Sequence, residues 1–189
     1  MDIQSLLNLA GEARSALTLL TQAAEQEETA FVANISECNR RASSELADLH
    51  AQLFRVFMSP LSRADCAGLA EALHRLTGAV FAVALLFPSR STSVGERRRE
   101  ELQSLCRMSI LIYEAAATLP RFVRGKQPPA PDTFRFYAEQ NKARAAHAMN
   151  VLHGERSLYD RALNEGLHDI EKALAEAYRA LLVLMLQSV

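Results

Sequence analysis

The sequence predicts an all-α protein, an antiparallel six-helix bundle, from three observations. Hydrophobic residues recur every three or four positions along almost the whole chain, without the sustained alternation that is typical of strands. Glycine makes up only 7 of 189 residues, which is few for a fold rich in tight turns. Apolar residues make up 49% of the chain and tryptophan is absent, which favours an aliphatic helical core. Helices joined by short corners can bury their apolar faces only against one another, so a bundle is expected.

The first three predicted helices each carry one apolar stripe. The helix at residues 3–26 has Leu6, Ala10, Ala13, Leu17, Leu20 and Ala24. The helix at residues 29–58 has Ile35, Ala42, Leu46, Leu49, Leu53 and Val56. Ser59-Pro60 should end it, because a residue before proline is disfavoured in the helical conformation. The helix at residues 63–87 has the most regular stripe, Leu69, Leu73, Leu76, Val80, Val83 and Phe87.

Three more helices are predicted in the second half of the chain. The helix at residues 94–124 has the stripe Leu102, Leu105, Met108, Ile112 and Leu119. It should kink near Pro120. Residues 133–153 form the least regular helix. Residues 158–187 return to a clear stripe: Leu163, Leu167, Ile170, Leu174, Leu181 and Leu184. We expect residues 1–189 to form a single domain, with a flexible proline-rich loop at about 124–131.

Three predicted helix starts carry a serine followed three residues later by an acid. In this arrangement the serine oxygen accepts from the backbone N–H of the third residue, while the acid favours the positive end of the helix. The three pairs are Ser62 with Asp65, Ser93 with Glu96, and Ser157 with Asp160. These three pairs predict where the third, fourth and sixth helices begin.

Composition and charge restrict the function classes. The net charge of −1 gives no general attraction to nucleic acid, and no nucleic-acid partner is expected. The longest apolar run, residues 180–186, is too short to span a bilayer, and no signal peptide is evident. Three widely spaced cysteines without a CxxC motif favour a reduced, cytoplasmic protein over a disulfide framework or a zinc site. No nucleophile motif or glycine-rich phosphate loop is present, so an enzyme is not expected.

Two Glu-x-x-His pairs leave a metal site open as an alternative. Glu71 with His74 and Glu165 with His168 each place both side chains on one helical face, a spacing that di-iron bundles use twice. Surface residues are the more ordinary interpretation, since Glu71 and His74 lie off the Leu73 stripe. A basic cluster at residues 97–99 is flanked by glutamates and is interpreted as a solvated charged face. No cofactor is expected; metal ions belong to the alternative.

The corner between the second and third helices has Phe57, Pro60, Arg63 and Asp65 in the pattern Phe-x-x-Pro-x-x-Arg-x-Asp. This corner resembles that of the PhoU-like accessory proteins of Pit-type phosphate transporters. In that family a helix with Glu-x-x-x-Asp ends in Phe-x-Thr-Pro-x-x-Arg-x-Asp, and the next helix begins Leu-Ala-x-x-Leu-Asp. Here Phe57, Pro60, Arg63 and Asp65 match the corner, with Ser59 for the usual threonine. The next helix continues with Leu69, Ala70 and Leu73. The resemblance covers roughly a quarter of the chain at the level of residues.

The chain departs from the family where metal-binding acids are usual. Aligned without a gap, the first acidic motif falls on Asn39 and Ser43, although a slip of one turn would bring in Glu37 or Glu45. The acids of the third helix and of the second motif fall on other residues: His74, Arg75, Gly78, Ala138 or Glu139, and Lys142 or Ala143. Because cations need carboxylate oxygens at such positions, the metal cluster is expected to be lost.

The resemblance implies a non-enzymatic accessory protein that regulates inorganic phosphate transport. Its partner would be a membrane phosphate transporter of the Pit type, reached peripherally at the inner face of the membrane. Homo-oligomers are common in the family, and residues 180–186 offer a contact surface. Two alternatives stay open: the di-iron-like bundle described above, and a helical scaffold protein with no connection to phosphate.

Overall fold

The computed structural model describes residues 3–26, 30–55, 61–87, 95–123, 131–154 and 157–186. These residues form helices and their connecting turns, without a strand among them. The helices are α1 (Ile3–Gln26), α2 (Ala30–Arg55), α3 (Arg63–Ala84), α4 (Glu96–Ala116), α5 (Leu119–Val123), α6 (Thr133–Gly154) and α7 (Leu158–Leu186). The all-α prediction is therefore confirmed, with one short helix, α5, beyond the six that were expected.

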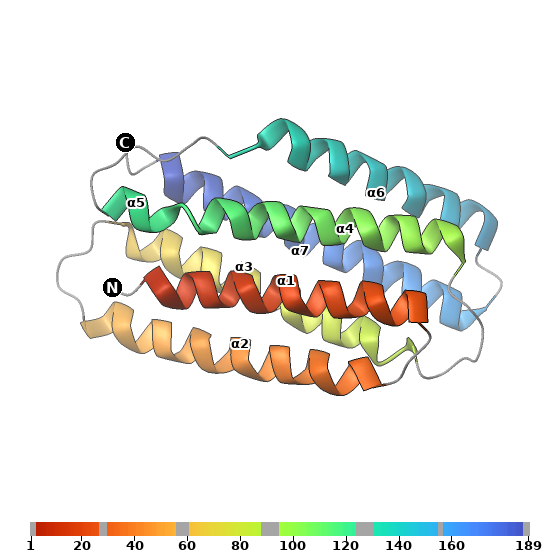
Figure 1. The fold of residues 1–189 in the computed structure, drawn as a ribbon, viewed down its shortest axis with the longest axis horizontal. Helices are drawn as coiled ribbons and strands as arrows, with labels where there is room; N and C mark the ends of the chain where they lie inside the picture. The colour runs from red at the N-terminus through yellow and green to blue at the C-terminus, as the bar shows by residue number, and fades with distance from the viewer. Residues whose placement is uncertain are drawn as a thin grey trace.

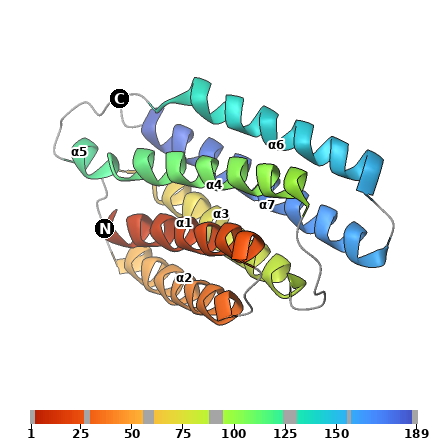
Figure 2. The same ribbon diagram turned by 45° about the vertical axis from the view of Figure 1, so that its right-hand side comes forward.

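The six long helices lie side by side as a bundle (Figure 1). Following the colour from red to blue, each long helix runs in the opposite direction to the one before it. The inner helices α1, α3, α4 and α7 make the bundle's centre: α1 packs against α2, α3 and α4, and α7 packs against α3, α4 and α6. In Figures 1 and 2, α2 and α6 lie at opposite edges of the bundle.

The predicted apolar stripes form the core. Every stripe residue within the described ranges is buried, except that Leu46 and Phe87 are only partly buried against the core. Val56 lies outside the described residues. The helical period of the sequence thus identified the buried faces of five of the long helices, because residues three and four apart fall on one side of a helix.

The predicted fourth helix is divided in the structure. It ends at Ala116, and a turn at residues 117–118 leads into α5. Pro120 explains the break, since it has no N–H to donate and its ring would collide with the carbonyl of Ala116. The Thr118 N–H and hydroxyl both turn to the carbonyl of Ala115, at 3.0 and 2.7 Å. What the sequence suggested as a kink is a full interruption.

Two of the three predicted helix caps are confirmed. Ser62 caps α3, with its Oγ 3.4 Å from the Asp65 nitrogen, and Ser157 caps α7, with its Oγ 3.1 Å from the Asp160 nitrogen. The prediction for α4 was wrong, because the helix begins at Glu96 with Gly95 as its N-cap and no side-chain cap. Ser93 lies outside the described residues.

Gly166 permits the close approach of α7 to α3. A Cβ atom at this position would lie 2.5 Å from Cγ2 of Val83 and 3.8 Å from its Cβ. Val83 is buried and β-branched, so it has little freedom to move aside. The glycine therefore sets the spacing of the α3–α7 contact.

We expect Gly166→Ala to lower the free energy of unfolding by about 1–3 kcal/mol, because the extra methyl group overpacks this contact. Urea denaturation measures the change. Gly68→Ala is the matched control in α3, where an added Cβ meets no atom within 4 Å. That control should be neutral or should stabilise by up to about 1 kcal/mol, through the better helix propensity of alanine. If both variants behaved alike, the close contact with Val83 would not limit the packing.

The described parts of the chain contain no helix that is both long enough and apolar enough to cross a membrane.

Candidate functional site

The corner that carries the family resemblance is described from Leu61 onward. Leu61 is buried, Arg63 is exposed at the first position of α3, and Asp65 occupies the capping position described above. Phe57 and Pro60 lie outside the described residues. The described half of the corner therefore has a structural role as a helix start, and it presents the Arg63 side chain on the surface.

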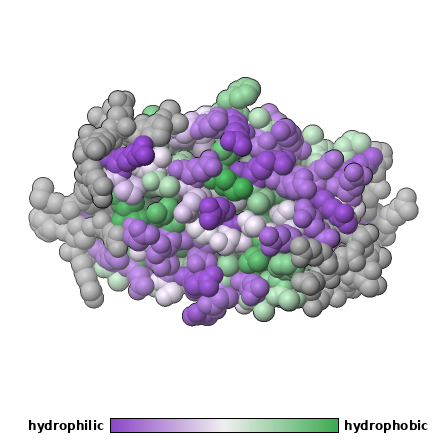
Figure 3. Space-filling view, in the orientation of Figure 1, coloured by the Kyte–Doolittle hydropathy of each residue, from purple (hydrophilic) through white to green (hydrophobic). Residues whose placement is uncertain are grey.

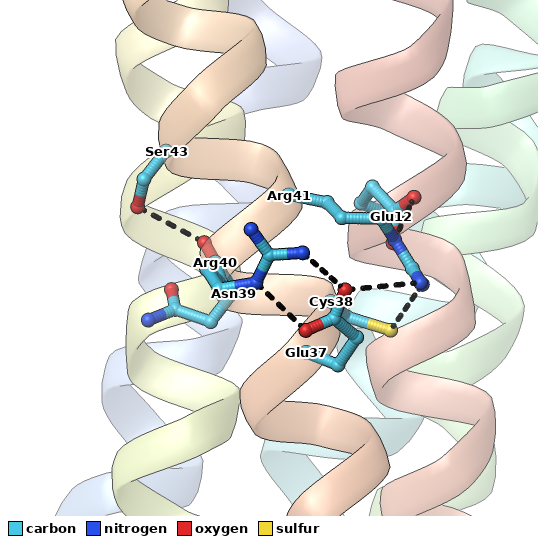
Figure 4. Close-up of polar contacts among 7 residues, drawn as sticks. All are labelled: Glu12, Glu37, Cys38, Asn39, Arg40, Arg41 and Ser43. Atoms are coloured by element: carbon cyan, nitrogen blue, oxygen red, sulfur yellow. Dashed lines mark hydrogen bonds and ion pairs between the residues drawn. The ribbon is translucent and has the colours of Figure 1, made fainter.

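At the position of the family's first acidic motif, the structure has a hydrogen-bonded cluster without a carboxylate between α2 and α3. The Thr77 hydroxyl lies 3.2 Å from Oδ1 of Asn39, and Oγ of Ser43 lies 2.9 Å from Nε2 of His74. Ser43 also donates to the backbone carbonyl of Asn39, at 3.0 Å (Figure 4). None of these four side chains is a carboxylate, so this cluster supplies no negative charge that would concentrate a cation.

Shifting the alignment of the acidic motif by one helical turn along α2 brings in Glu37 or Glu45, but neither is a free carboxylate. Arg40 donates to both oxygens of Glu37, at 2.8 and 2.6 Å, and the hydrogen bond from Arg40 lowers the pKa of Glu37 (Figure 4). Glu45 accepts from Nδ2 of Asn8 on α1, at 2.9 Å. Arg41 likewise donates to both oxygens of Glu12, at 2.8 and 2.9 Å, across the α1–α2 contact. Glu12 and Glu45 thus join α1 to α2, whereas Glu37 is paired with an arginine of its own helix.

The second acidic motif of the family falls on α6, where one carboxylate is present and is neutralised. Glu139 is buried and accepts from Nε of Arg107 on α4, at 2.7 Å, and from Nζ of Lys142, at 2.8 Å. Burial opposes ionisation here, but the hydrogen bonds from Lys142 and Arg107 outweigh it and lower the pKa of Glu139. Two cations already occupy the space in which a metal ion would have to bind.

The structure places the two Glu-x-x-His pairs in different surroundings. Nε2 of His50 on α2 lies 3.7 Å from an oxygen of Glu71, and His74 bonds Ser43 as described. Glu165 is exposed on α7, whereas His168 faces α6. Among the described residues, no group of three or more His, Cys, Asp or Glu side chains is arranged to hold a metal ion.

His168 belongs to a different cluster, which the sequence did not indicate. Its ring stacks on that of His147 from α6, with centroids 5.4 Å apart. Nδ1 of His147 lies 2.9 Å from Oε1 of Glu101 on α4, and Nδ2 of Asn150 donates to the other oxygen of Glu101, at 2.8 Å. Glu101 is 2% exposed, and this burial raises its pKa, although Asn150 and His147 partly offset the effect.

A second buried carboxylate lies on the other side of the stacked rings. Glu171 on α7 is 5% exposed and accepts a short hydrogen bond from Nε2 of Gln140. Nε of Arg144 also donates to it, at 3.1 Å, while Nδ1 of His168 lies 3.9 Å away. The two glutamates, the two histidines, Arg144 and Ala143 line a cavity of about 210 Å³ between α4, α6 and α7.

This cluster joins three helices by hydrogen bonds around two buried carboxylates, while Arg144 and His168 reach the surface. Each carboxylate has polar partners, which buried charges require. The sequence contains a signal from which this cluster could have been predicted, because Glu101 precedes Leu105 by four residues and Glu171 follows Leu167 by four. Both acids therefore fall on the apolar stripes of their helices. Acids on a stripe are informative, since they need buried partners on neighbouring helices.

The buried cysteines have the properties of structural thiols. Burial raises the pKa of Cys66 to about 11. Burial, together with the neighbouring Glu12, raises the pKa of Cys38 to about 11. A thiol with a raised pKa carries little thiolate at neutral pH, so neither is an activated nucleophile.

Comparisons with known proteins identify the fold. No protein-family model matches the sequence, and a search of curated proteins finds no sequence match. Solved structures do match. A PhoU-like protein from Shewanella oneidensis MR-1 superposes with a TM-score of 0.75 and 13% sequence identity, covering 100% of both chains. A second protein from the same organism, described as a PhoU-like phosphate regulatory protein, gives a TM-score of 0.72 and 13% identity, covering 99% of both chains.

These matches extend over the whole chain and include every helix. At 13% identity they establish architecture, and they agree with the resemblance that the corner at residues 57–65 had suggested. The chain therefore has the PhoU-like fold.

Proposed function

We propose that this chain is a non-enzymatic regulator of inorganic phosphate transport that docks on a Pit-type transporter. The observation that carries the proposal is the full-length likeness to two PhoU-like proteins, one of them described as a phosphate regulatory protein. The described half of the Phe57–Asp65 corner supports it, since Asp65 and its cap have the expected form. Under this proposal residues 1–189 act as one domain, in the cytoplasm and peripherally at the inner face of the membrane.

The same proposal holds that the chain has lost the family's metal cluster and works through its helical faces. The Asn39–Ser43 cluster, which contains no carboxylate, and the Glu139 carboxylate, held by Arg107 and Lys142, support this part. Carboxylates that already have cationic partners would have to exchange them for a metal ion. A homo-oligomer is also part of the proposal, since PhoU-like relatives commonly assemble.

A pull-down from gently crosslinked cells, including solubilised membranes, tests the partner. We expect mass spectrometry to identify a phosphate permease with the wild-type chain and to lose it with Arg63→Glu. Arg63 is chosen because it is exposed beside the family corner, so reversing its charge changes the surface and not the core. Arg179→Glu is the matched control, an exposed arginine on α7.

The control variant should recover as much permease as the wild type. Recovery of soluble proteins only, or of the chain by itself, would refute the role in phosphate transport and leave the fold unaffected. Equal loss in both variants would show that general charge, and not the corner, governs the interaction.

A further inference from the structure

Helix α6 carries an apolar strip on the side opposite its buried face. The buried face itself is largely polar, since Glu139, Gln140 and Asn150 are among its buried side chains. This inner face packs against α4 and α7 through Phe136 and Ala143, which are 0% and 2% exposed. At about 100° per residue, the positions opposite Ala143 form the outer strip of α6. Its members are Phe134, Tyr137, Ala138, Asn141, Ala145, Ala148, Met149 and Leu152. None is charged, which is unusual for the solvent side of a bundle helix.

The outer strip is exposed along its length. Phe134 at one end is 87% exposed and Leu152 at the other is 73% exposed, while Tyr137 and Met149 are 44% and 40% exposed. The strip extends for about 27 Å, from the helical rise of 1.5 Å per residue. In Figure 3 one group of hydrophobic atoms projects at the upper edge, where α6 lies in Figure 1, among hydrophilic atoms on either side. All members of the strip are exposed except Ala138, which is half-buried, so no described segment of the chain covers the strip.

The charges of α6 that border the outer strip are basic. Arg135 is exposed, and the side chains of Lys142 and Arg144 are 62% and 60% exposed. Their carboxylate partners are recessed, since the side chains of Glu139 and Glu171 are only 8% and 6% exposed. Within α6, arginine and lysine tips therefore form the outermost charge on both sides of the strip, although the whole chain carries a net charge of −1. On the neighbouring α4, two arginines and one acid line a groove beside Ala145 and Met149: Arg97, Arg107 and Glu100.

One acid lies at the end of the strip. Asp132 is exposed just before α6, but its Oδ1 accepts from the backbone N–H of Arg135, at 3.0 Å, so it acts as the helix cap. Within α6 the only acid is Glu139. An apolar face bordered by basic side chains is the pattern of helices that lie in a membrane interface.

The same charges disfavour a second copy of the chain on this strip. Lys142 and Arg144 lie on either side of position 143, the midpoint between Phe134 and Leu152. An antiparallel pair of copies centred there would set Lys142 beside Lys142 of the second copy, and Arg144 beside its counterpart. Like charges placed together oppose such a dimer, whereas lipid phosphates would complement all of them.

We propose that the outer strip of α6 binds an anionic lipid surface. The apolar side chains at the two ends of the strip enter the headgroup region, and Arg135, Lys142 and Arg144 meet the lipid phosphates. The proposal rests on α6 alone and does not depend on the transporter as partner. The inner face of α6 stays packed on the bundle, so binding requires no rearrangement of the core.

Flotation of the full-length chain with lipid vesicles tests the proposal. We expect binding to phosphatidylcholine vesicles that contain phosphatidylglycerol, weaker binding to phosphatidylcholine alone, and a decrease as salt is added. Replacing both end residues in Phe134→Ser with Leu152→Ser should reduce the affinity about tenfold or more, because the apolar insertion is lost. Arg135→Glu should reduce the preference for phosphatidylglycerol.

Leu85→Ser is the matched control, an apolar residue that is 52% exposed beyond the end of α3. It should bind vesicles like the wild type, and circular dichroism should show all variants equally helical. Absence of vesicle binding, or binding unchanged in the Phe134/Leu152 variant, would overturn the proposal. So would a wild-type dimer in sedimentation velocity that this variant converts to a monomer, because the strip would then be an interface between copies.

Discussion

Asp160→Ala is expected to lower the free energy of unfolding by about 3–5 kcal/mol, because it leaves a buried arginine without its counter-ion. Both terminal nitrogens of Arg98 on α4 lie 3.1 Å from Oδ1 of Asp160, and the two side chains are 14% and 9% exposed. The Ser157 hydroxyl also donates to Oδ2 of Asp160, at 2.7 Å. Urea denaturation of the purified protein measures the loss.

A double-mutant cycle separates the ion pair from the helix cap. Adding Arg98→Met to Asp160→Ala removes the unpaired charge, so the double variant should be less destabilised than the sum of the single variants. Asp169→Ala is the matched control, since Asp169 is exposed and lies 4.0 Å from Lys172; its effect should stay below about 1 kcal/mol. Strictly additive losses at Arg98 and Asp160 would mean that the pair is not coupled.

Leu73→Ala is expected to cost about 2–5 kcal/mol, through lost burial and the cavity that it leaves. Leu73 is 0% exposed and lies on the apolar stripe of α3, which packs against α1, α2 and α7. The spread in the estimate reflects how far these neighbours can close the cavity. The same denaturation measurement applies, with circular dichroism to confirm that the helices remain.

Leu85→Ala provides the comparison at the end of the same helix, because Leu85 is 52% exposed and creates no cavity when truncated. Its effect should be within about 0.5 kcal/mol. A near-zero effect at Leu73 would contradict its place in the core, and equal effects at both positions would contradict the burial that distinguishes them.

Most of the fold could be predicted from the sequence, because helix formation and helix ends are local. The stripes on α3 and α7 identified buried residues correctly, and Ser62 and Ser157 marked two helix starts. The prediction failed where a local pattern was ambiguous. Pro120 interrupts the predicted fourth helix completely, and the same helix begins only at Glu96, after the N-cap Gly95. Both differences concern where a helix ends, not which face it buries.

The candidate sites were less predictable, because they join residues that are far apart in the chain. The two Glu-x-x-His pairs were found by spacing, yet of their four residues only His168 joins the cluster around the buried Glu101 and Glu171, where it stacks on His147. The predicted solvated face at residues 97–99 was wrong for Arg98, which is paired in the interior with Asp160. A spacing on one helix does not reveal which side chains a neighbouring helix brings to it.

The sequence by itself determined the helices, their buried faces and the likeness of one corner to PhoU-like proteins, since period and capping act within a few residues. Only the tertiary structure decided how the charges are used. It buried Glu101, Glu139 and Glu171 against partners from other helices and left the outer strip of α6 uncovered. The physical reason is that desolvation and charge pairing depend on the distance between helices, which no local pattern encodes.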